Sequence, residues 1–256
     1  VGIQHRNFEL LLACMQQRLN VFLVGPAGSS KTCAFEAAAK ALGLDFYPQS
    51  VGPQTTQSEL KGYMDATGDY VVSNFRRAFE HGGVFLLDEA DRGNAGVLTF
   101  LNAALSNGYC AFPDGVVKRH PDFVAGAAAN TWGRGADRQY VGATQLDAAT
   151  LDRFVFLSWD IDEAFEAALV GVQRASTPVQ IAEGGTMTPE EWYTQVVKWR
   201  KAAQELGLRV IISPRATLMG CKLFAAGVGR THVEELVVWR GTDATTRQKI
   251  AEKAAT

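Results

Sequence analysis

Residues 25–32 have the types and spacing of a loop that binds phosphate groups. In order they are Gly25, Pro26, Ala27, Gly28, Ser29, Ser30, Lys31 and Thr32, and Cys33 follows them. An apolar run precedes the loop and an Ala-rich segment follows it, which predicts a strand, a turn and a helix start. Backbone N–H groups at such a helix start attract anions. We therefore expect Lys31 to neutralise the β- and γ-phosphates of a nucleotide and the Thr32 hydroxyl to be a ligand of Mg²⁺.

One position departs from the G-x-x-x-x-G-K-[ST] pattern, because Ser30 stands where a second glycine is expected. Serine is small enough for a phosphate to approach, but its side chain disfavours a positive φ. We therefore expect an ordinary backbone conformation at Ser30.

Polar side chains follow two further apolar runs at the point where each run ends. Asp88 and Glu89 follow residues 84–87, and Asn130 follows residues 123–129. Open α/β sheets bind ligands at the carboxyl ends of their strands. At such an edge Asp88 would hold Mg²⁺, and Glu89 would orient and deprotonate an attacking water. The neutral amide of Asn130 would hydrogen-bond the γ-phosphate and the same water.

Arg153 lies between a short helical stretch, residues 146–152, and the apolar run 154–157. It either contacts a phosphate or forms a local surface pair with Asp147 or Asp152, which would contribute little to stability.

Arg215 follows Ser213 and Pro214, which are typical of a helix start. A cation there opposes the helix dipole, and an anionic ligand would explain it. Arg134 and Arg138, in the segment 133–142, are further candidates for a phosphate contact.

The order of elements predicts two domains. Helices and strands alternate to about residue 158, which is typical of a parallel sheet with helices on both faces. Turn residues inside residues 62–72 and 109–119 predict two β-hairpins inserted in this core. From residue 160 onward the pattern is helical. We therefore expect a nucleotide-binding core at 1–159 and a small all-α lid domain at 160–256.

Three helix starts are expected in the second part, each with capping-box spacing. The pairs are Asp160 with Glu163, Thr188 with Glu191, and Thr231 with Glu234. One apolar stripe is expected to be core rather than a ligand site, and its members are Trp192, Val196, Trp199, Ala203 and Leu206. Residues 173–186 lack periodicity and are expected to form a mobile connector.

The composition limits the partners and the cellular location that we expect for this protein. The chain has 256 residues, 47% of them apolar, and a net charge of −2, so no global charge favours nucleic acid or an anionic membrane. The four cysteines are widely spaced, which indicates neither disulfides nor a metal cluster. No apolar run reaches the length of a membrane span, and no signal-peptide pattern is present. We expect a cytoplasmic protein.

In the order of these motifs the chain resembles the AAA+ ATPases, over nearly its whole length. The two hairpins and residues 146–154 resemble more narrowly the MoxR and dynein-related branch. Within it, the segments 130–141 and 145–147 most resemble proteins like the ATPase subunit of cobaltochelatase, including those often seen in phage genomes. That branch often has a small non-glycine residue before the lysine, as here.

The resemblance implies roles for single residues. Lys31 and Thr32 correspond to the Walker A pair, and Asp88 and Glu89 to the Walker B pair. Asn130 corresponds to sensor 1, Arg215 to sensor 2, and Arg153 to an arginine finger that acts in trans on a neighbouring subunit. Arg134 and Arg138 remain alternatives for the finger.

The resemblance further implies a hexameric homo-oligomer that hydrolyses ATP with Mg²⁺ and remodels an unidentified protein substrate or adaptor. The hairpins would face the pore or that partner. Two alternatives remain open. One is a nucleic-acid translocase like McrB, which the negative net charge disfavours. The other is an assembly module that binds ATP and hydrolyses little of it, which Glu89 disfavours.

Overall fold

The computed structural model describes residues 3–172, 178–182 and 185–256. The chain divides into two compact units. Residues 7–26 and 30–160 form the core unit, and the described residues of 161–256, with 3–6 and 27–29, form the C-terminal unit. Within these described ranges, none of the helices combines the length and apolar composition of a bilayer span.

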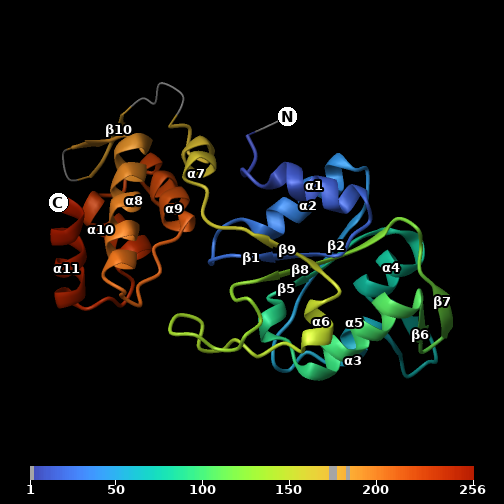
Figure 1. Ribbon diagram of the computed structural model, residues 1–256. Helices are drawn as coiled ribbons and strands as arrows, with labels where there is room; N and C mark the ends of the chain where they lie inside the picture. Colours follow the sequence, from blue (N-terminus) through green and yellow to red (C-terminus); the bar gives the residue numbers. More distant parts are fainter. Residues whose placement is uncertain (1–2, 173–177, 183–184) are drawn as a thin grey trace. The chain divides into compact units, whose positions relative to one another are not determined.

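A five-stranded parallel sheet lies at the centre of the core unit (Figure 1). Its strand order is β2-β5-β8-β1-β9. The strands are β1 (Val21–Val24), β2 (Phe46–Ser50), β5 (Gly83–Asp88), β8 (Phe123–Ala129) and β9 (Val155–Ser158). Because β8 pairs with both β1 and β5, the carboxyl ends of these three strands lie side by side at one edge of the sheet. The expected α/β fold with a parallel sheet is confirmed.

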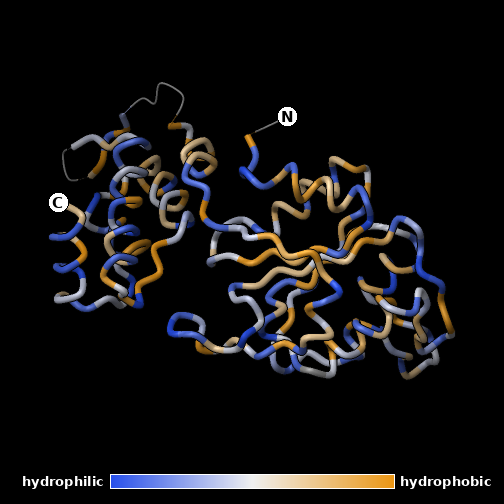
Figure 2. Tube along the Cα trace, viewed as in Figure 1, coloured by the Kyte–Doolittle hydropathy of each residue, from blue (hydrophilic) through white to orange (hydrophobic). Residues whose placement is uncertain are grey.

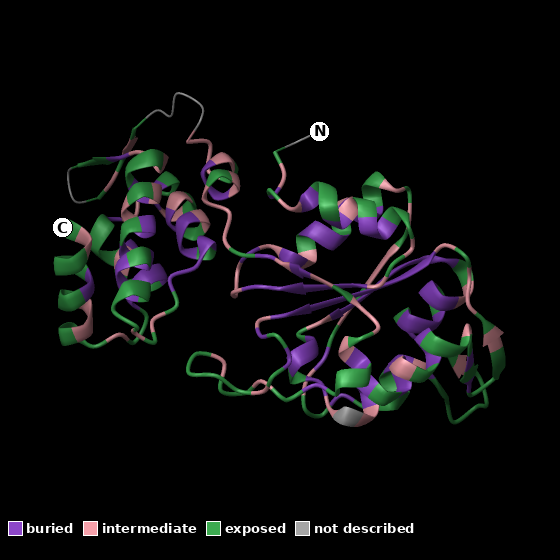
Figure 3. Ribbon diagram, viewed as in Figure 1, coloured by how far each residue is buried: buried purple, intermediate pink, exposed green. Residues whose placement is uncertain are grey.

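Both faces of the sheet are covered by helices, which is why its central strands are apolar at successive positions. Helices α1 (Phe8–Gln16) and α2 (Lys31–Ala41) pack on one face, where Val21, Leu23 and Val84 belong to one buried cluster. The other face packs against α3 (Gln57–Lys61), α4 (Asn74–His81) and α5 (Ala95–Asn107), and a short helix, α6 (Ala148–Leu151), follows along the chain. Figure 2 shows the strands as a hydrophobic layer, and Figure 3 shows the same layer as buried.

Sequence patterning did not indicate β2. Its residues form no apolar run, include Pro48, and are only partly buried or exposed. Proline cannot donate a hydrogen bond to a neighbouring strand, so it is tolerated at the edge of a sheet, and β2 is an edge strand.

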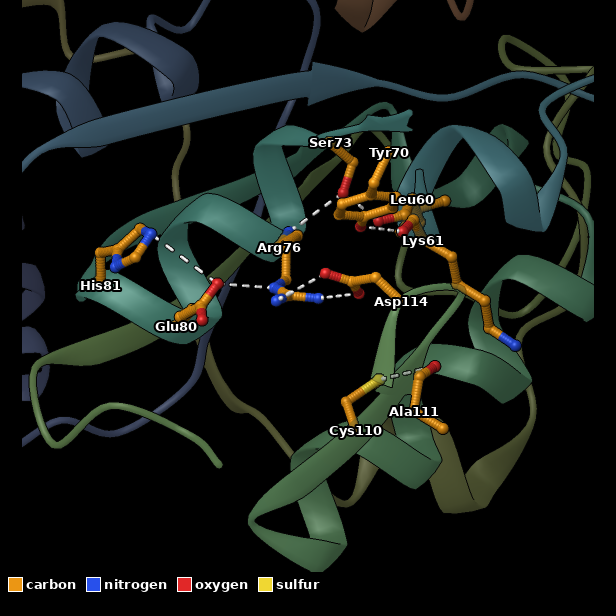
Figure 4. Close-up of polar contacts among 10 residues, drawn as sticks. All are labelled: Leu60, Lys61, Tyr70, Ser73, Arg76, Glu80, His81, Cys110, Ala111 and Asp114. Carbon is orange, nitrogen blue, oxygen red and sulfur yellow. Dashed lines mark hydrogen bonds and ion pairs between the residues drawn. The ribbon is translucent and has the colours of Figure 1, made fainter. Parts of the chain in front are cut away.

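Both expected hairpins are present, and one arginine of α4 contacts both of them. The first pairs β3 (Tyr63–Met64) with β4 (Tyr70–Val71), and the second pairs β6 (Tyr109–Phe112) with β7 (Gly115–Lys118). Arg76, which is buried, donates from Nη1 to Asp114 Oδ1 at 2.7 Å and lies over the ring of Tyr70, 5.4 Å from its centroid (Figure 4). Its Nε donates to Glu80 at 2.7 Å, and this bond lowers the pKa of that carboxyl. Both hairpins are therefore held by the same side chain, that of Arg76.

The C-terminal unit is helical. Its elements are α7 (Glu163–Leu169), β10 (Val179–Gln180), β11 (Thr186–Met187), α8 (Pro189–Glu205), α9 (Pro214–Ala225), α10 (Arg230–Glu234), the π-helical turn η2 (Glu235–Trp239) and α11 (Ala244–Ala255). Trp192 and Trp199 lie in its buried core, with their rings 6.0 Å apart. Of the stripe predicted to be core, four members are buried, whereas Leu206 ends α8 and is 41% exposed.

Two of the three predicted helix starts are wrong. Asp162, not Asp160, caps α7, because its carboxylate accepts from the N–H groups of the first turn. Gly229 precedes α10, so Thr231 lies inside that helix. Only Thr188 forms the predicted capping box with Glu191. Capping-box spacing is short and frequent, so it marks a start reliably only where an apolar stripe follows.

The predicted connector at 173–186 falls partly on residues 173–177 and 183–184, which lie outside the described residues. Within the described part, β10 pairs with β11 in antiparallel register. The unit expected to be all-α therefore also contains this short strand pair.

A buried ion pair joins three helices of the C-terminal unit. Arg200 on α8 donates two hydrogen bonds of 2.7 Å to Glu166 on α7, and the Thr217 hydroxyl on α9 donates to the same carboxylate at 2.5 Å. Arg200 Nε also donates to the Ile212 carbonyl at 2.7 Å. The two charged side chains are 5% and 2% exposed, so removing one charge leaves the other buried without its partner.

We therefore predict that Glu166→Gln lowers the free energy of unfolding by about 3–5 kcal/mol. Lys201→Ala is the matched control, because Lys201 pairs with Glu163 at 2.9 Å where both side chains are largely in solvent. It should cost at most about 1 kcal/mol. Urea denaturation followed by tryptophan fluorescence measures both values, and equal losses would contradict the importance of burial.

Candidate active site

The loop that leaves β1 has a backbone that only small residues allow. A Cβ on Gly25 would lie 1.9 Å from the carbonyl oxygen of Trp159, so no other residue fits there. Ser30 has φ 68° and ψ 29°, in the left-handed region. The expectation of an ordinary conformation at Ser30 is therefore wrong. A side chain in this region costs about 1–2 kcal/mol, and the turn into α2 imposes it because Ser30 takes the place of the second glycine.

The ammonium group of Lys31 connects two strand ends. Lys31 is 8% exposed, and its Nζ donates to the carbonyls of Gly25 at 2.7 Å and Pro26 at 3.0 Å. It also donates to Oδ1 of Asn130, at the end of β8, at 3.1 Å. A buried ammonium requires such acceptors, because burial removes its water. The predicted convergence of the loop and Asn130 is thus present as a direct contact.

Thr32 and Asp88 are also in direct contact. The Thr32 hydroxyl donates to Oδ2 of Asp88 at 2.6 Å, and Oδ1 of Asp88 accepts from the N–H of Glu89 at 2.9 Å. A hydroxyl and a carboxylate side by side are the hard oxygen ligands that Mg²⁺ prefers. No cluster of three or more His, Cys, Asp or Glu side chains that could hold a metal occurs among the described residues. The site therefore fits a Mg²⁺ that takes its other ligands from phosphate and water, as is usual for this ion.

Glu89 follows Asp88 directly, and its side chain is exposed at the strand edge. Its φ of 56° lies in the left-handed region, which costs of order 1–3 kcal/mol for a residue other than glycine. The following 3₁₀ turn, η1 (Ala90–Arg92), begins there, because the N–H of Arg92 donates to the Glu89 carbonyl at 2.8 Å. Glu89 is therefore an exposed carboxylate directly after Asp88, at the turn that leaves β5.

Sequence reasoning missed Asp91, which lies behind Asn130. Its buried carboxylate accepts hydrogen bonds from the backbone N–H groups of Asn130 and Thr131. No local pattern marks this residue, because its partners are about forty positions away and come close only through the pairing of β5 with β8. The sequence itself shows only a third acidic residue two positions after Glu89.

The guanidinium of Arg153 is hydrogen-bonded to two nearby residues, Ser106 and Ala149. Its Nε donates to the Ser106 hydroxyl at 2.8 Å, and its Nη1 donates to the Ala149 carbonyl. Within the described residues no ion pair joins it to Asp147 or Asp152, so the local-pair alternative is wrong. Nor does any hydrogen bond in that part of the chain join Arg153 to the phosphate loop or to the carboxylate pair.

The remaining predicted residues are exposed. Arg134 and Arg138 lie on the segment that follows Asn130, where Arg134 pairs with Gln145 in an isolated bridge. Cys33 is exposed on the first turn of α2. Arg215 belongs to the C-terminal unit, where it is exposed on the first turn of α9 after Ser213 and Pro214.

Known proteins share parts of this chain. The Lon protease of Syntrophus aciditrophicus (strain SB) is 37% identical over 73 residues, which are 27% of this chain and 9% of that protein. Lon protease 1 of Borreliella burgdorferi is 36% identical over 87 residues, which are 32% of this chain and 11% of that protein. The similarity spans about a tenth of the length of these relatives, so it concerns a shared segment and not their proteolytic activity.

The fold is similar to that of NtrX from Brucella abortus, with a TM-score of 0.51 and 17% identity over 95% of this chain and 52% of NtrX. Residues 20–154 match the AAA domain family in its dynein-related subfamily. This match covers more than half of the chain, and it includes the phosphate loop, the carboxylate pair, Asn130 and Arg153. The chain belongs to the dynein-related subfamily of AAA domains.

Proposed function

We propose that this protein hydrolyses ATP at the carboxyl edge of its parallel sheet and uses the energy to remodel a protein partner. The observation that carries the proposal is the direct contact among the ends of three strands. Lys31 bonds to Asn130 at 3.1 Å, and Thr32 bonds to Asp88 at 2.6 Å. These contacts gather a cation, an amide, a hydroxyl and a carboxylate within one site, which is the set that phosphoryl transfer to water requires.

Each residue takes one role in this proposal. Lys31 neutralises the β- and γ-phosphates, while Asp88 and Thr32 hold Mg²⁺. The ion supplies positive charge that offsets the charge on the phosphate oxygens. Glu89 takes a proton from the attacking water, and Asn130 orients that water through its amide. No covalent step on the protein is needed, because positioning and electrostatics are sufficient for this reaction.

We further propose that the active form is a hexameric ring in which Arg153 reaches the site of a neighbouring subunit. The proposal is supported by the hydrogen bonds of Arg153, whose guanidinium donates to Ser106 and Ala149 and, among the described residues, to no group of the phosphate loop of its own chain. Arg215 is proposed to sense the bound nucleotide, as its correspondence to sensor 2 implies. An arginine that stabilises transition-state charge is worth orders of magnitude in such reactions.

The partner is proposed to be a protein because of the side chains that the hairpins expose. Tyr63, Tyr109 and Val116 are 53%, 58% and 70% exposed. Exposed apolar and aromatic side chains that lie on two neighbouring hairpins are typical of surfaces that contact other proteins. These features agree with a motor of the MoxR or cobaltochelatase type. Such a motor would act in the cytoplasm and could belong to a cell or to a phage. ATPase stimulation by DNA or RNA would instead favour a translocase.

We predict that Glu89→Gln leaves the affinity for ATP and Mg²⁺ within about 3-fold of the wild-type value and lowers turnover at least about 100-fold, because it removes the base but not the metal ligand. Lys31→Ala should instead lose binding. Calorimetry with a non-hydrolysable analogue measures affinity, and phosphate release measures turnover.

Glu9→Gln is the control for this pair, because Glu9 is exposed on α1 and does not belong to the phosphate loop or to the helix that follows it, so the change should leave both values unchanged. An equal loss of nucleotide affinity in Glu89→Gln and Lys31→Ala would contradict the division of roles.

A second prediction concerns the finger. Arg153→Ala and Lys31→Ala should each be nearly inactive alone, because each lacks one half of the site. Mixed under conditions of subunit exchange, they should recover a clear fraction of wild-type turnover, since some interfaces then combine an intact loop with an intact arginine. Phosphate release by the mixture measures this recovery.

The same mixing with Arg134→Ala or Arg138→Ala shows whether one of those arginines is the finger instead. Arg77→Ala, on the exposed side of α4, should stay active without mixing. If mixing restores nothing for any of the three arginines, no arginine of this set acts in trans.

A further inference from the structure

The carboxylate of Asp91 is bonded to the end of β8 by three hydrogen bonds. Its Oδ2 accepts from the N–H of Asn130 at 3.1 Å, from the N–H of Thr131 at 3.0 Å and from the Thr131 hydroxyl at 2.9 Å. Asp91 is 1% exposed. Hydrogen bonds to an ionised group in such a place are stronger than neutral ones, because they replace water that the charge has lost. Asn130 is therefore held through its backbone by one buried charge.

Asp91 is also fixed to Glu89 through the chain. The two residues belong to one turn, which the hydrogen bond from the Arg92 N–H to the Glu89 carbonyl closes at 2.8 Å. A second bond, from the N–H of Gly93 to the Ala90 carbonyl at 3.3 Å, continues it. Because this turn is short and bonded, the position of the Asp91 carboxylate and the backbone of Glu89 are coupled. Asp91 thus joins the proposed base to the proposed water-orienting amide.

A third element meets the same residue. The main-chain carbonyl of Asp91 accepts from both the N–H and the hydroxyl of Thr144, at 2.6 and 2.9 Å. Thr131 and Thr144 are the two ends of a loop, residues 131–144, and both ends are bonded to Asp91. The N–H of Leu146 donates to the Gly133 carbonyl at 2.8 Å and closes the base of the loop further.

The rest of this loop leaves the sheet edge and is exposed (Figure 1, lime-coloured). Val141 is 73% exposed, and Arg134 and Arg138 lie on the same loop. The loop is bonded internally as well, because the carboxylate of Asp137 accepts from the N–H groups of Gln139 and Tyr140. The loop is also held by Trp132, whose ring stacks on that of Phe156 with centroids 6.1 Å apart, and by the Thr144 hydroxyl, which donates to the Gly93 carbonyl at 3.3 Å. Because both ends of the loop are hydrogen-bonded to Asp91, a displacement of its exposed part reaches that residue.

We propose that Asp91 is a positioning residue that aligns Asn130 with Glu89 and makes this alignment depend on the loop 131–144. The inference rests on the proposed function, since it assigns roles to Glu89 and Asn130. It predicts that loss of the Asp91 contacts slows turnover and leaves nucleotide binding intact, because the hydrogen bonds of the Lys31 ammonium and of the Thr32–Asp88 pair go to groups other than Asp91. A merely structural role predicts a loss of stability and of binding together.

Two sets of variants test the proposal. Asp91→Asn keeps the shape of the side chain and one acceptor oxygen. Asp91→Ala removes the whole carboxylate and with it every side-chain acceptor. Oδ1 of Asp91 accepts no hydrogen bond within the described residues, so the amide nitrogen of asparagine fits there without opposing a donor. Turnover should fall in the order wild type, Asp91→Asn, Asp91→Ala, with a loss of at least about 10-fold in the last and with the ATP affinity unchanged within about 2-fold.

Thr131→Val removes only the hydroxyl that donates to Asp91, so it tests the same contact in a chain that keeps its buried charge. It should lower turnover about 3-fold or more, and Thr131→Ser, which restores the hydroxyl, should recover most of it. Thr55→Val is the matched control. Thr55 is a buried threonine whose hydroxyl also bonds to backbone, accepting from the N–H of Gly52 at 2.9 Å, outside this network.

Turnover, affinity for a non-hydrolysable ATP analogue and amide hydrogen exchange at Asn130 and Thr131 are measured on each variant. Faster exchange at these two amides in Asp91→Asn, together with slower turnover and retained affinity, supports the proposal. Unchanged turnover in both Asp91→Asn and Thr131→Val, or an equal loss in Thr55→Val, overturns it. Absence of turnover in the wild-type protein overturns the proposed function itself, which separates the two failures.

Discussion

The buried ammonium of Lys31 is the constraint on which the site depends. A charge that is 8% exposed must find acceptors in the protein, and here they come from the loop after β1 and from Asn130 after β8. These two segments can both reach Lys31 only if β1 and β8 are neighbours in the sheet and run in the same direction. β5 lies on the other side of β8, and this places Asp88 within 2.6 Å of Thr32, the residue after the lysine. The strand order thus brings together the acceptors that the buried ammonium needs and the carboxylate beside Thr32.

The backbone is strained in both halves of this site. Ser30 and Glu89 have positive φ values of 68° and 56°, and neither is a glycine. Each such residue costs about 1–3 kcal/mol, which the surrounding structure must offset. At Ser30 the conformation starts α2 directly at Lys31, and at Glu89 it turns the chain out of β5 so that the carboxylate faces solvent. Next to each of these turns a buried charged side chain, Lys31 or Asp91, makes hydrogen bonds to the backbone.

Much of this arrangement could be predicted from local sequence. The strands β1 and β8 are continuous apolar runs, and the polar residues that follow them are visible at once. Features that depend on distant partners could not be predicted. Asp91 belongs to no recognisable sequence motif, and the hydrogen bond that it accepts from Asn130 exists only because β5 pairs with β8. The edge strand β2 lacks an apolar run because one of its sides has no neighbour, and the helix start at Asp162 differs from the expected one by a short shift that the spacing rule does not resolve. Arg153 could be singled out from the sequence. Its hydrogen bond to Ser106 could not, because this bond forms only where α5 packs beside α6.

The central claim is that the hydroxyl of Thr32 and the carboxylate of Asp88 hold a metal ion together with a nucleotide. The most direct test is electron paramagnetic resonance of Mn²⁺, which replaces Mg²⁺, titrated with and without a non-hydrolysable ATP analogue. We predict that each chain binds Mn²⁺ tightly only when the analogue is present, because the protein supplies few of the ligands, and that Asp88→Asn weakens this binding at least about 10-fold. Tight binding of Mn²⁺ without nucleotide, or an unchanged affinity in Asp88→Asn, would contradict the account.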